Sequence, residues 1–161
     1  MEFRKMRRFK QQLSEQATEE VLRRGDTAVL GVINANGYPY TVPVNYLYAK
    51  GRIYFHCAKQ GEKLDAIRQN DKVSLCVIDQ DDIQPEKLTT FYRSVIVFGR
   101  ARILEDMAEI HDMVEAMGMK YLPDKKAVAA DIARRLNNVV VIEVSIEHMT
   151  GKESMELVRM R

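Results

Sequence analysis

The chain has 161 residues, of which 46% are hydrophobic and 30% charged, and its formal net charge at pH 7 is +2. This length suits one domain of roughly 100–200 residues, and the apolar fraction is high enough for a core, which excludes an intrinsically disordered chain. The apolar runs are far too short for a membrane span of about 20 residues, and no secretory signal is apparent. We therefore expect a soluble, cytoplasmic protein.

The positive charge is concentrated in an N-terminal arm, residues 1–13. Its first ten residues carry five cations against one glutamate, which leaves the remainder of the chain slightly negative. Useful affinity for nucleic acid normally needs a broad basic face with several phosphate contacts. We therefore expect no nucleic-acid partner, and an arm that is either solvated or clasps a partner subunit.

A helix and a series of strands are predicted for the first half of the chain. Ser14 can cap a helix that begins at Glu15, and Gly25 can end it in a left-handed conformation. Asn36-Gly37 between two β-rich runs is a strong hairpin signal. The predicted elements are a helix at 15–24, strands at 27–33, 38–48 and 52–56, and a short helix at 62–69.

The second half combines longer strands with two helices. Gly99 lies within a long β run and predicts a bulge or bend. Apolar residues recur at three- and four-residue steps on both sides of Pro123, which is typical of amphipathic helices. The predicted elements are a strand at 72–78, a polar connection at 79–90, a strand at 91–104, the two helices, a strand at 138–146 and a tail at 149–161.

Five or six antiparallel strands joined mainly by tight turns favour a small closed or partly open barrel, because the alternation of strand and helix that builds a doubly wound sheet is missing. We expect one mainly β domain over residues 1–161 with peripheral helices. Several apolar residues of the tail would be hard for a monomer to bury, so we expect the tail to pack on a partner subunit.

The segment 56–65 is the most informative for chemistry. It places Gly61 and Lys63 where a strand gives way to a helix, and a helix N-terminus with an adjacent lysine can bind a phosphate. The spacing is not that of a nucleotide-binding P-loop. A surface helix that happens to begin Gly-Glu-Lys is the alternative interpretation.

Two further clusters are candidate binding positions. Tyr92, Arg93, Ser94 and Val95 bring an arginine and a hydroxyl to the head of a strand, where they could bind phosphate or could simply face water. In segment 41–45, a proline interrupts a good strand. Because proline cannot donate to a β-ladder, this strand is predicted to be an edge, a bulge or a surface facing a planar ligand.

The histidines and cysteines carry weaker signals. His56 is predicted to point away from the face that holds Ile53 and Phe55, where it could be a structural residue or a proton donor. Cys57 and Cys76 lack CxxC spacing, so we expect reduced, apolar side chains. The three histidines are too scattered to propose a metal site.

Three segments together resemble the FMN-binding split-barrel proteins, relatives of pyridoxamine 5′-phosphate oxidase. Within that group the chain is most similar to the nitroimidazole-resistance (Nim-type) flavoproteins. The resemblance covers residues 6–150 and implies a homodimer of six-stranded antiparallel Greek-key split barrels, with FMN at the subunit interface. The matching segments are 37–45 (GYPYTVPVN), 53–58 (IYFHCA) with 61–65 (GEKLD), and 90–101 (TFYRSVIVFGRA).

The resemblance also implies roles for individual residues. It places one strand beside the flavin ring, a second along the ribityl chain, Lys63 on the phosphate and His56 close to the flavin as a candidate proton donor. The implied cofactor-binding positions are Thr41, Val42, Pro43, Val44, Asn45, His56, Cys57, Ala58, Lys63, Tyr92, Arg93, Ser94 and Val95.

Departures from the oxidases narrow the expected function. The chain has no tryptophan and no counterpart of the C-terminal residues with which the oxidases hold pyridoxal phosphate, so oxidation of pyridoxamine phosphate is not expected. We expect an FMN-dependent oxidoreductase that reduces a small acceptor such as a nitroaromatic. A flavin carrier or redox sensor without turnover, and a split barrel that uses haem or the deazaflavin F420, remain the alternatives.

Overall fold

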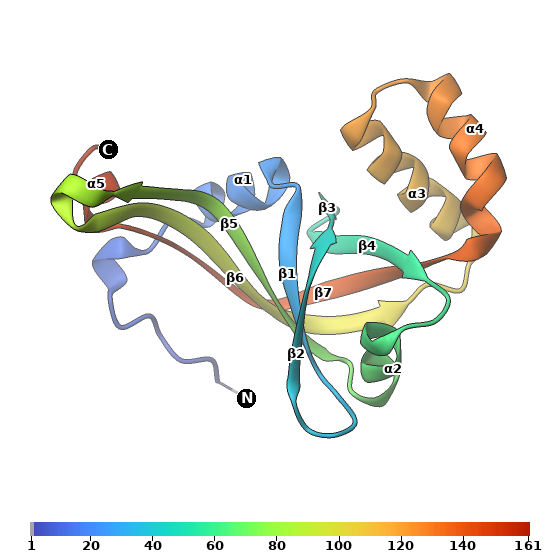
Figure 1. The fold of residues 1–161 in the computed structure, drawn as a ribbon, viewed down its shortest axis with the longest axis horizontal. Coiled ribbons are helices and arrows are strands. Elements are labelled where there is room, and N and C mark those ends of the chain that lie inside the picture. Colours follow the sequence, from blue (N-terminus) through green and yellow to red (C-terminus); the bar gives the residue numbers. More distant parts are fainter. Residues whose placement is uncertain (1) are drawn as a thin grey trace.

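A computed structural model describes residues 2–161 as a strongly bent antiparallel sheet with helices around it (Figure 1). Its elements, in chain order, are η1 (Phe9–Gln11), α1 (Glu15–Arg24), β1 (Thr27–Ile33), β2 (Pro39–Asn45), β3 (Leu47–Ala49), β4 (Arg52–Ala58), α2 (Glu62–Gln69), β5 (Lys72–Gln84), η2 (Pro85–Lys87), β6 (Thr89–Ile103), α3 (Met107–Tyr121), α4 (Lys125–Arg135), η3 (Leu136–Asn138), β7 (Val139–Glu153) and α5 (Met155–Val158).

The sheet has seven strands in the order β2-β1-β5-β6-β7-β4-β3, rather than the six that we expected. The difference arises in the predicted strand 38–48, which Tyr46 divides into β2 and β3. Tyr46 is fully buried, and its hydroxyl donates to the Leu22 carbonyl oxygen over 2.7 Å. Because this side chain turns into the core, the ladder is interrupted there. Strands β2 and β4 contact one another and bring the two ends of the sheet together.

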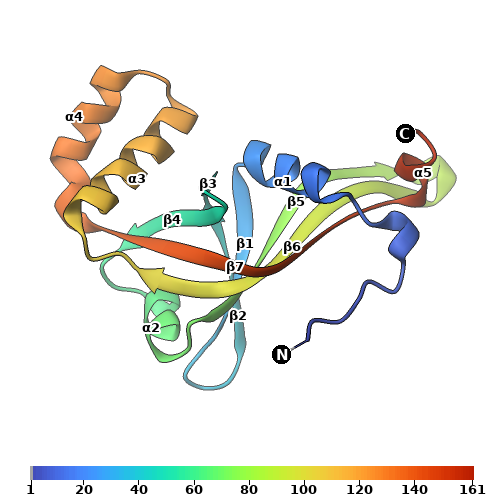
Figure 2. The ribbon, with the colours of Figure 1, turned by 180° about the vertical axis from the view of Figure 1, so that it is seen from behind.

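Strands β5, β6 and β7 run beyond their predicted ends. The predicted polar connection at 79–90 is mostly strand, with only a short η2 turn, because β5 and β6 continue as a hairpin that extends from the barrel and can carry polar side chains (Figure 2). Strand β7 continues to Glu153, and α5 then contacts β6 and η1. Most of the predicted tail therefore packs within the chain.

Two glycines show how the sequence shapes these elements. At Gly99 the register between β6 and β7 shifts, which confirms the predicted bulge, and a Cβ there would overlap the carbonyl oxygen of Ser145. The prediction for Gly25 was wrong, because its φ is −70° and not left-handed. It ends α1 where a side chain would overlap the Tyr46 hydroxyl, so its role is close packing.

The barrel interior forms the main core. Helix α1 contributes Val21 and Leu22 to this core and α2 contributes Leu64 and Ile67, alongside the inward residues of the strands. A second core lies outside the barrel, where α3 covers β4 and β7; it contains Tyr54, Leu104, Ile110, Met113, Met117 and Val141. Within residues 2–161, no helix has the length and apolar character needed to cross a bilayer.

Candidate functional site

Strand β2 alternates between the core and the outer surface. Val42 and Val44 pack toward the barrel interior, whereas Thr41, Pro43 and Asn45 are exposed on the opposite side of the strand, which faces away from the barrel. Strand β2 pairs only with β1, so it is an edge strand, which is one of the three arrangements that the proline predicted. A ligand on this strand would meet three outward side chains and the unpaired backbone groups of the free edge.

Strand β4 shows the same alternation. Cys57 lies in the barrel core, while His56 and Ala58 are on the outer side. Partial burial lowers the pKa of His56 below its ordinary value of 6.5, nearby Arg135 acts in the same direction, and Asp131 opposes them. His56 therefore lies close to α4 and is mostly neutral at pH 7.

Helix α2 begins directly beyond β4. Gly61 has a φ of 148°, a conformation that favours glycine, and no side chain caps the first N–H groups of the helix. Lys63 is half-buried in the first turn. Burial raises the pKa of the Cys57 thiol, and the charge of Lys63 partly offsets this effect, which places the lysine near the end of β4.

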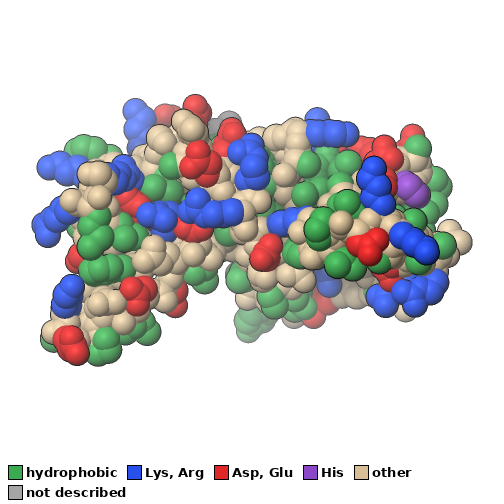
Figure 3. Space-filling model, turned by 90° about the horizontal axis from the view of Figure 1, so that it is seen from above, with side chains coloured by type: hydrophobic (Ala, Val, Ile, Leu, Met, Phe, Trp, Pro, Cys, Tyr) green, Lys and Arg blue, Asp and Glu red, His purple; other side chains and the backbone are tan. Residues whose placement is uncertain are grey.

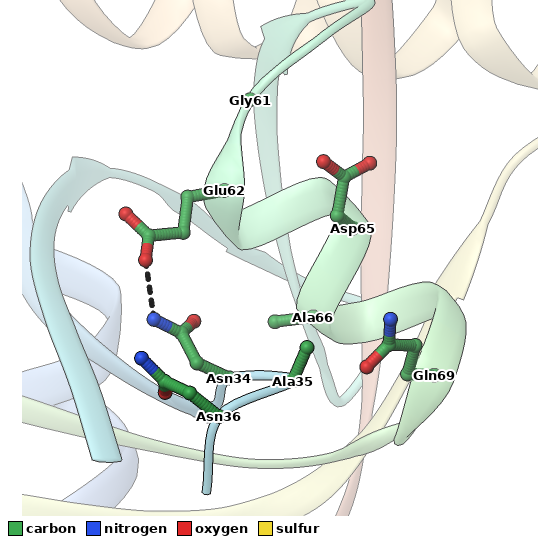
Figure 4. Close-up of a pocket in the computed structure, with 8 residues that line it drawn as sticks. All are labelled: Asn34, Ala35, Asn36, Gly61, Glu62, Asp65, Ala66 and Gln69. Carbon is green, nitrogen blue, oxygen red and sulfur yellow. Dashed lines mark hydrogen bonds between the residues drawn. The ribbon is translucent and has the colours of Figure 1, made fainter. Parts of the chain in front are cut away.

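A cavity of about 390 Å³ lies on another side of α2 (Figure 4). Asn34 and Asn36, from the turn between β1 and β2, line it together with Glu62 and Asp65 of α2, and the Asn34 amide donates to the Glu62 carboxylate. Lys63 does not line this cavity. The two carboxylates of this cavity, Glu62 and Asp65, would repel a phosphate. An anion bound by Lys63 would therefore lie outside the cavity.

The cluster on β6 is divided between the two faces of the sheet. Tyr92 and Ser94 lie on the outer face, whereas Val95 is fully buried in the barrel. Arg93 also turns inward and is held by two carboxylates, with Nε 3.0 Å from Glu153 and Nη1 3.2 Å from Asp79. Because both acids already neutralise this guanidinium, Arg93 holds β6 to β5 and β7 in this chain.

The outward residues of five strands form one continuous surface, which we call the outer face. In one of its rows, half-buried small and apolar side chains lie beside exposed Pro43. The paired residues across this row are Pro43 with Val29, Val29 with Cys76, Cys76 with Ile96, and Ile96 with Thr150.

Charge on the molecular surface is mixed rather than segregated in the view from above. Figure 3 shows basic and acidic side chains interspersed along this side of the molecule, with hydrophobic side chains between them. Many arginine side chains among the described residues are paired with carboxylates; Arg24, for example, meets Asp79 through two 2.6 Å hydrogen bonds.

The structure therefore separates the implied site residues into two groups. Those on β2 and β4 lie on two strands that contact one another, and α2 follows β4 directly, while those on β6 lie near the tip of the β5–β6 hairpin (Figure 1). The alternation could be read from the sequence. The partners of Arg93 could not, because Asp79 and Glu153 lie 14 and 60 residues away along the chain.

Comparison with known proteins identifies related chains. A sequence model of the family described as pyridoxamine 5′-phosphate oxidase matches residues 14–153. No curated protein gives a significant match.

Solved structures share the fold. A candidate 5-nitroimidazole antibiotic resistance protein from Bacteroides thetaiotaomicron is 24% identical, with a TM-score of 0.72 over 88% of this chain and 86% of that one. The flavocytochrome Anf3 from Azotobacter vinelandii is 19% identical, with a TM-score of 0.79 over 93% and 72%. The haem storage protein HutZ from Vibrio cholerae is 13% identical, with a TM-score of 0.65 over 86% and 94%.

Proposed function

Because the chain belongs to the pyridoxamine 5′-phosphate oxidase family, we propose that it binds FMN and reduces a small acceptor such as a nitroaromatic. The observation that carries this proposal is the contact of β2 with β4, together with the start of α2 directly after β4 in the chain. There, a flat exposed strand, a neutral histidine and an uncapped helix N-terminus with a lysine lie on neighbouring elements.

The residues fit a phosphorylated planar cofactor. Lys63 and the free N–H groups of α2 supply positive charge and donors for a phosphate. Thr41, Pro43 and Asn45 provide a surface for a flat ring, and the residues between them offer backbone groups only, since their side chains face the core. When bound, FMN supplies hydride and electron transfer, and the chain positions and tunes it.

A second copy of the chain completes this site in our proposal. The β6 group lies apart from the β2–β4 group within one chain, so a homodimer is the simplest way to bring Tyr92 and Ser94 to the cofactor. Exposed apolar side chains support this arrangement, since Ile78 is 60% exposed on β5 and Leu88 is 95% exposed at the hairpin tip. Such patches commonly mark interaction surfaces.

His56 is the candidate proton donor to the reduced acceptor. It is exposed on the outer side of β4, so a small molecule can reach it, and Asp131 on α4 favours its protonated form. Because its pKa is lowered, the protonated fraction is small at pH 7 and grows in acid. Proton donation by His56 therefore predicts turnover that rises as the pH falls.

A visible spectrum and an FMN titration of the purified protein test the proposal. We expect flavin absorbance, or saturable binding of added FMN, and repeated turnover of a nitroaromatic with a reductant. Binding with only a single reoxidation would indicate a flavin carrier or sensor. Absence of FMN binding would refute the proposal.

Haem binding is the second candidate function. An exposed histidine is a residue type that ligates haem iron, and two of the proteins of similar fold are described as a flavocytochrome and a haem storage protein. Haem added to the protein should then give a ligated-haem spectrum that His56→Ala removes, whereas an unchanged spectrum in that variant would exclude His56 as the ligand.

A further inference from the structure

The N-terminal arm covers part of the outer face through an aromatic stack. Phe98 on β6 pairs in register with His148 on β7, at the bulge. The ring of Phe3 lies 4.7 Å from that of His148 with only 5° between their planes, and 5.6 Å from that of Phe98. The Phe98–His148 pair therefore presents a surface that accepts a flat ring.

A cavity of about 500 Å³ lies between the arm and β7. This volume falls within the range of roughly 300–1,000 Å³ that is usual for small-molecule sites. Three rings, two cations and two uncharged polar side chains account for most of its wall, and no carboxylate is among them; the wall residues are Phe3, Arg4, Lys5, Met6, Phe9, Gln12, His148 and Thr150.

The cations of this wall are free to meet an anion. No ion pair among residues 2–161 involves Arg4 or Lys5, although many arginines elsewhere are paired with carboxylates. Their charges lie in the same cavity as the stacked rings. The wall thus combines stacking surfaces with unneutralised positive charge, and each component recognises a different part of one ligand.

We propose that this cavity, formed by the arm and β7, binds a planar aromatic anion. The ring packs against the aromatic side chains that line the cavity, Phe3, Phe9 and His148, and the anionic group is held by Arg4 and Lys5. A nucleoside monophosphate and an aromatic carboxylate both have this chemistry. The site is distinct from the proposed flavin site on β2, β4 and α2, and it does not depend on flavin binding.

Calorimetric titration of the 161-residue chain, with flavin retained if it copurifies, tests this proposal. The probes are adenosine 5′-monophosphate and 1-naphthoate, with adenosine and inorganic phosphate as controls that each lack one half of the chemistry. We expect at least one aromatic anion to bind about tenfold or more tightly than both controls. The probe that binds more tightly shows whether the natural ligand is a nucleoside monophosphate or an aromatic carboxylate. If neither aromatic anion binds, or if inorganic phosphate binds as tightly as the aromatic anions, the proposal is wrong.

Two matched double variants test whether the ligand binds in this cavity. Arg4→Gln with Lys5→Gln should weaken binding by about tenfold or more, whereas Arg7→Gln with Arg8→Gln should leave it nearly unchanged. Both pairs remove two charges from the same exposed arm, but only the first pair lines this cavity. Equal losses in the two variants would show general charge attraction and overturn the site. His148→Leu should weaken the aromatic anion without affecting phosphate.

Discussion

Glu143 is a buried carboxylate on the outer side of the barrel. It lies on β7 directly opposite Tyr54 on β4 and Arg102 on β6, and only 2% of it is exposed. The Tyr54 hydroxyl donates to it over 3.0 Å, Arg52 approaches to 2.8 Å and Arg102 to 3.1 Å. These contacts tie three strands together beneath α3.

We expect Glu143→Gln to lower the free energy of unfolding at pH 7 by about 2–3 kcal/mol. Removing one partner of a buried ion pair typically costs about 3–5 kcal/mol. The lower value applies because both arginine side chains are about half exposed, at 47% and 53%, so water solvates them once the carboxylate is gone. The substitution keeps the shape of the side chain, so no cavity adds to the cost.

The effect should also depend on pH. Hydrogen bonds from Arg52, Tyr54 and Arg102 hold the pKa of Glu143 below its ordinary value of 4.5, although burial alone would raise it. A carboxyl with a lowered pKa stabilises the fold above its unfolded pKa, and this stabilisation is lost as the pH falls through the folded pKa. The deficit of Glu143→Gln should therefore shrink in acid.

Urea unfolding followed by circular dichroism measures both effects, at one protein concentration so that any dimerisation is held constant. Glu147→Gln is the matched control, because Glu147 also lies on β7 and pairs with an arginine of β6 over 2.6 Å, but is 41% exposed. It should change stability little. A deficit for Glu143→Gln no larger than that of the control, or one equally large at about pH 3, would refute this reasoning.

Three further substitutions test the site and the fold. Lys63→Ala should weaken FMN binding by about 10–100-fold, measured by fluorescence titration, whereas Lys59→Ala, just before the helix, should have little effect. His56→Gln should slow nitroaromatic turnover by about 100-fold and abolish the fall in rate that we expect as the pH rises through a pKa below 6.5; an unchanged pH profile would exclude proton donation. Gly99→Ala should destabilise the fold in urea titration by about 1–3 kcal/mol, because its Cβ meets a backbone oxygen that cannot move freely.

Local signals predicted much of the fold. The Ser14 N-cap of α1, the Asn36-Gly37 turn and the bulge at Gly99 are set by neighbouring residues, and the structure has each of them. The division at Tyr46 was not predictable in this way, because an aromatic residue in a β run looks like any other strand position. What breaks the strand is a hydrogen bond to Leu22, a partner 24 residues away.

The candidate site also has features that neighbouring residues set and features that depend on distant parts of the chain. Alternation along β2 and β4 could have shown that Val42, Val44 and Cys57 face the core, because side chains in a strand change sides at every residue. The environment of Arg93 could not be predicted, since its two carboxylates come from different strands. An arginine beside a hydroxyl has the same pattern whether it binds a phosphate or closes a salt-bridge network.

The outer face is already divided among elements of the chain itself. Helix α3 covers the first half of β7, where Val141 is buried, and the arm covers the second half at His148. The outward sides of β1 and β5 and the neighbouring part of β6 have no such cover among the described residues, and Cys76 and Ile78 lie there. A second copy that packs on this remaining strip would meet β2 on one side and the arm on the other. Dimerisation would then place the proposed flavin site and the proposed anion site on opposite borders of one interface.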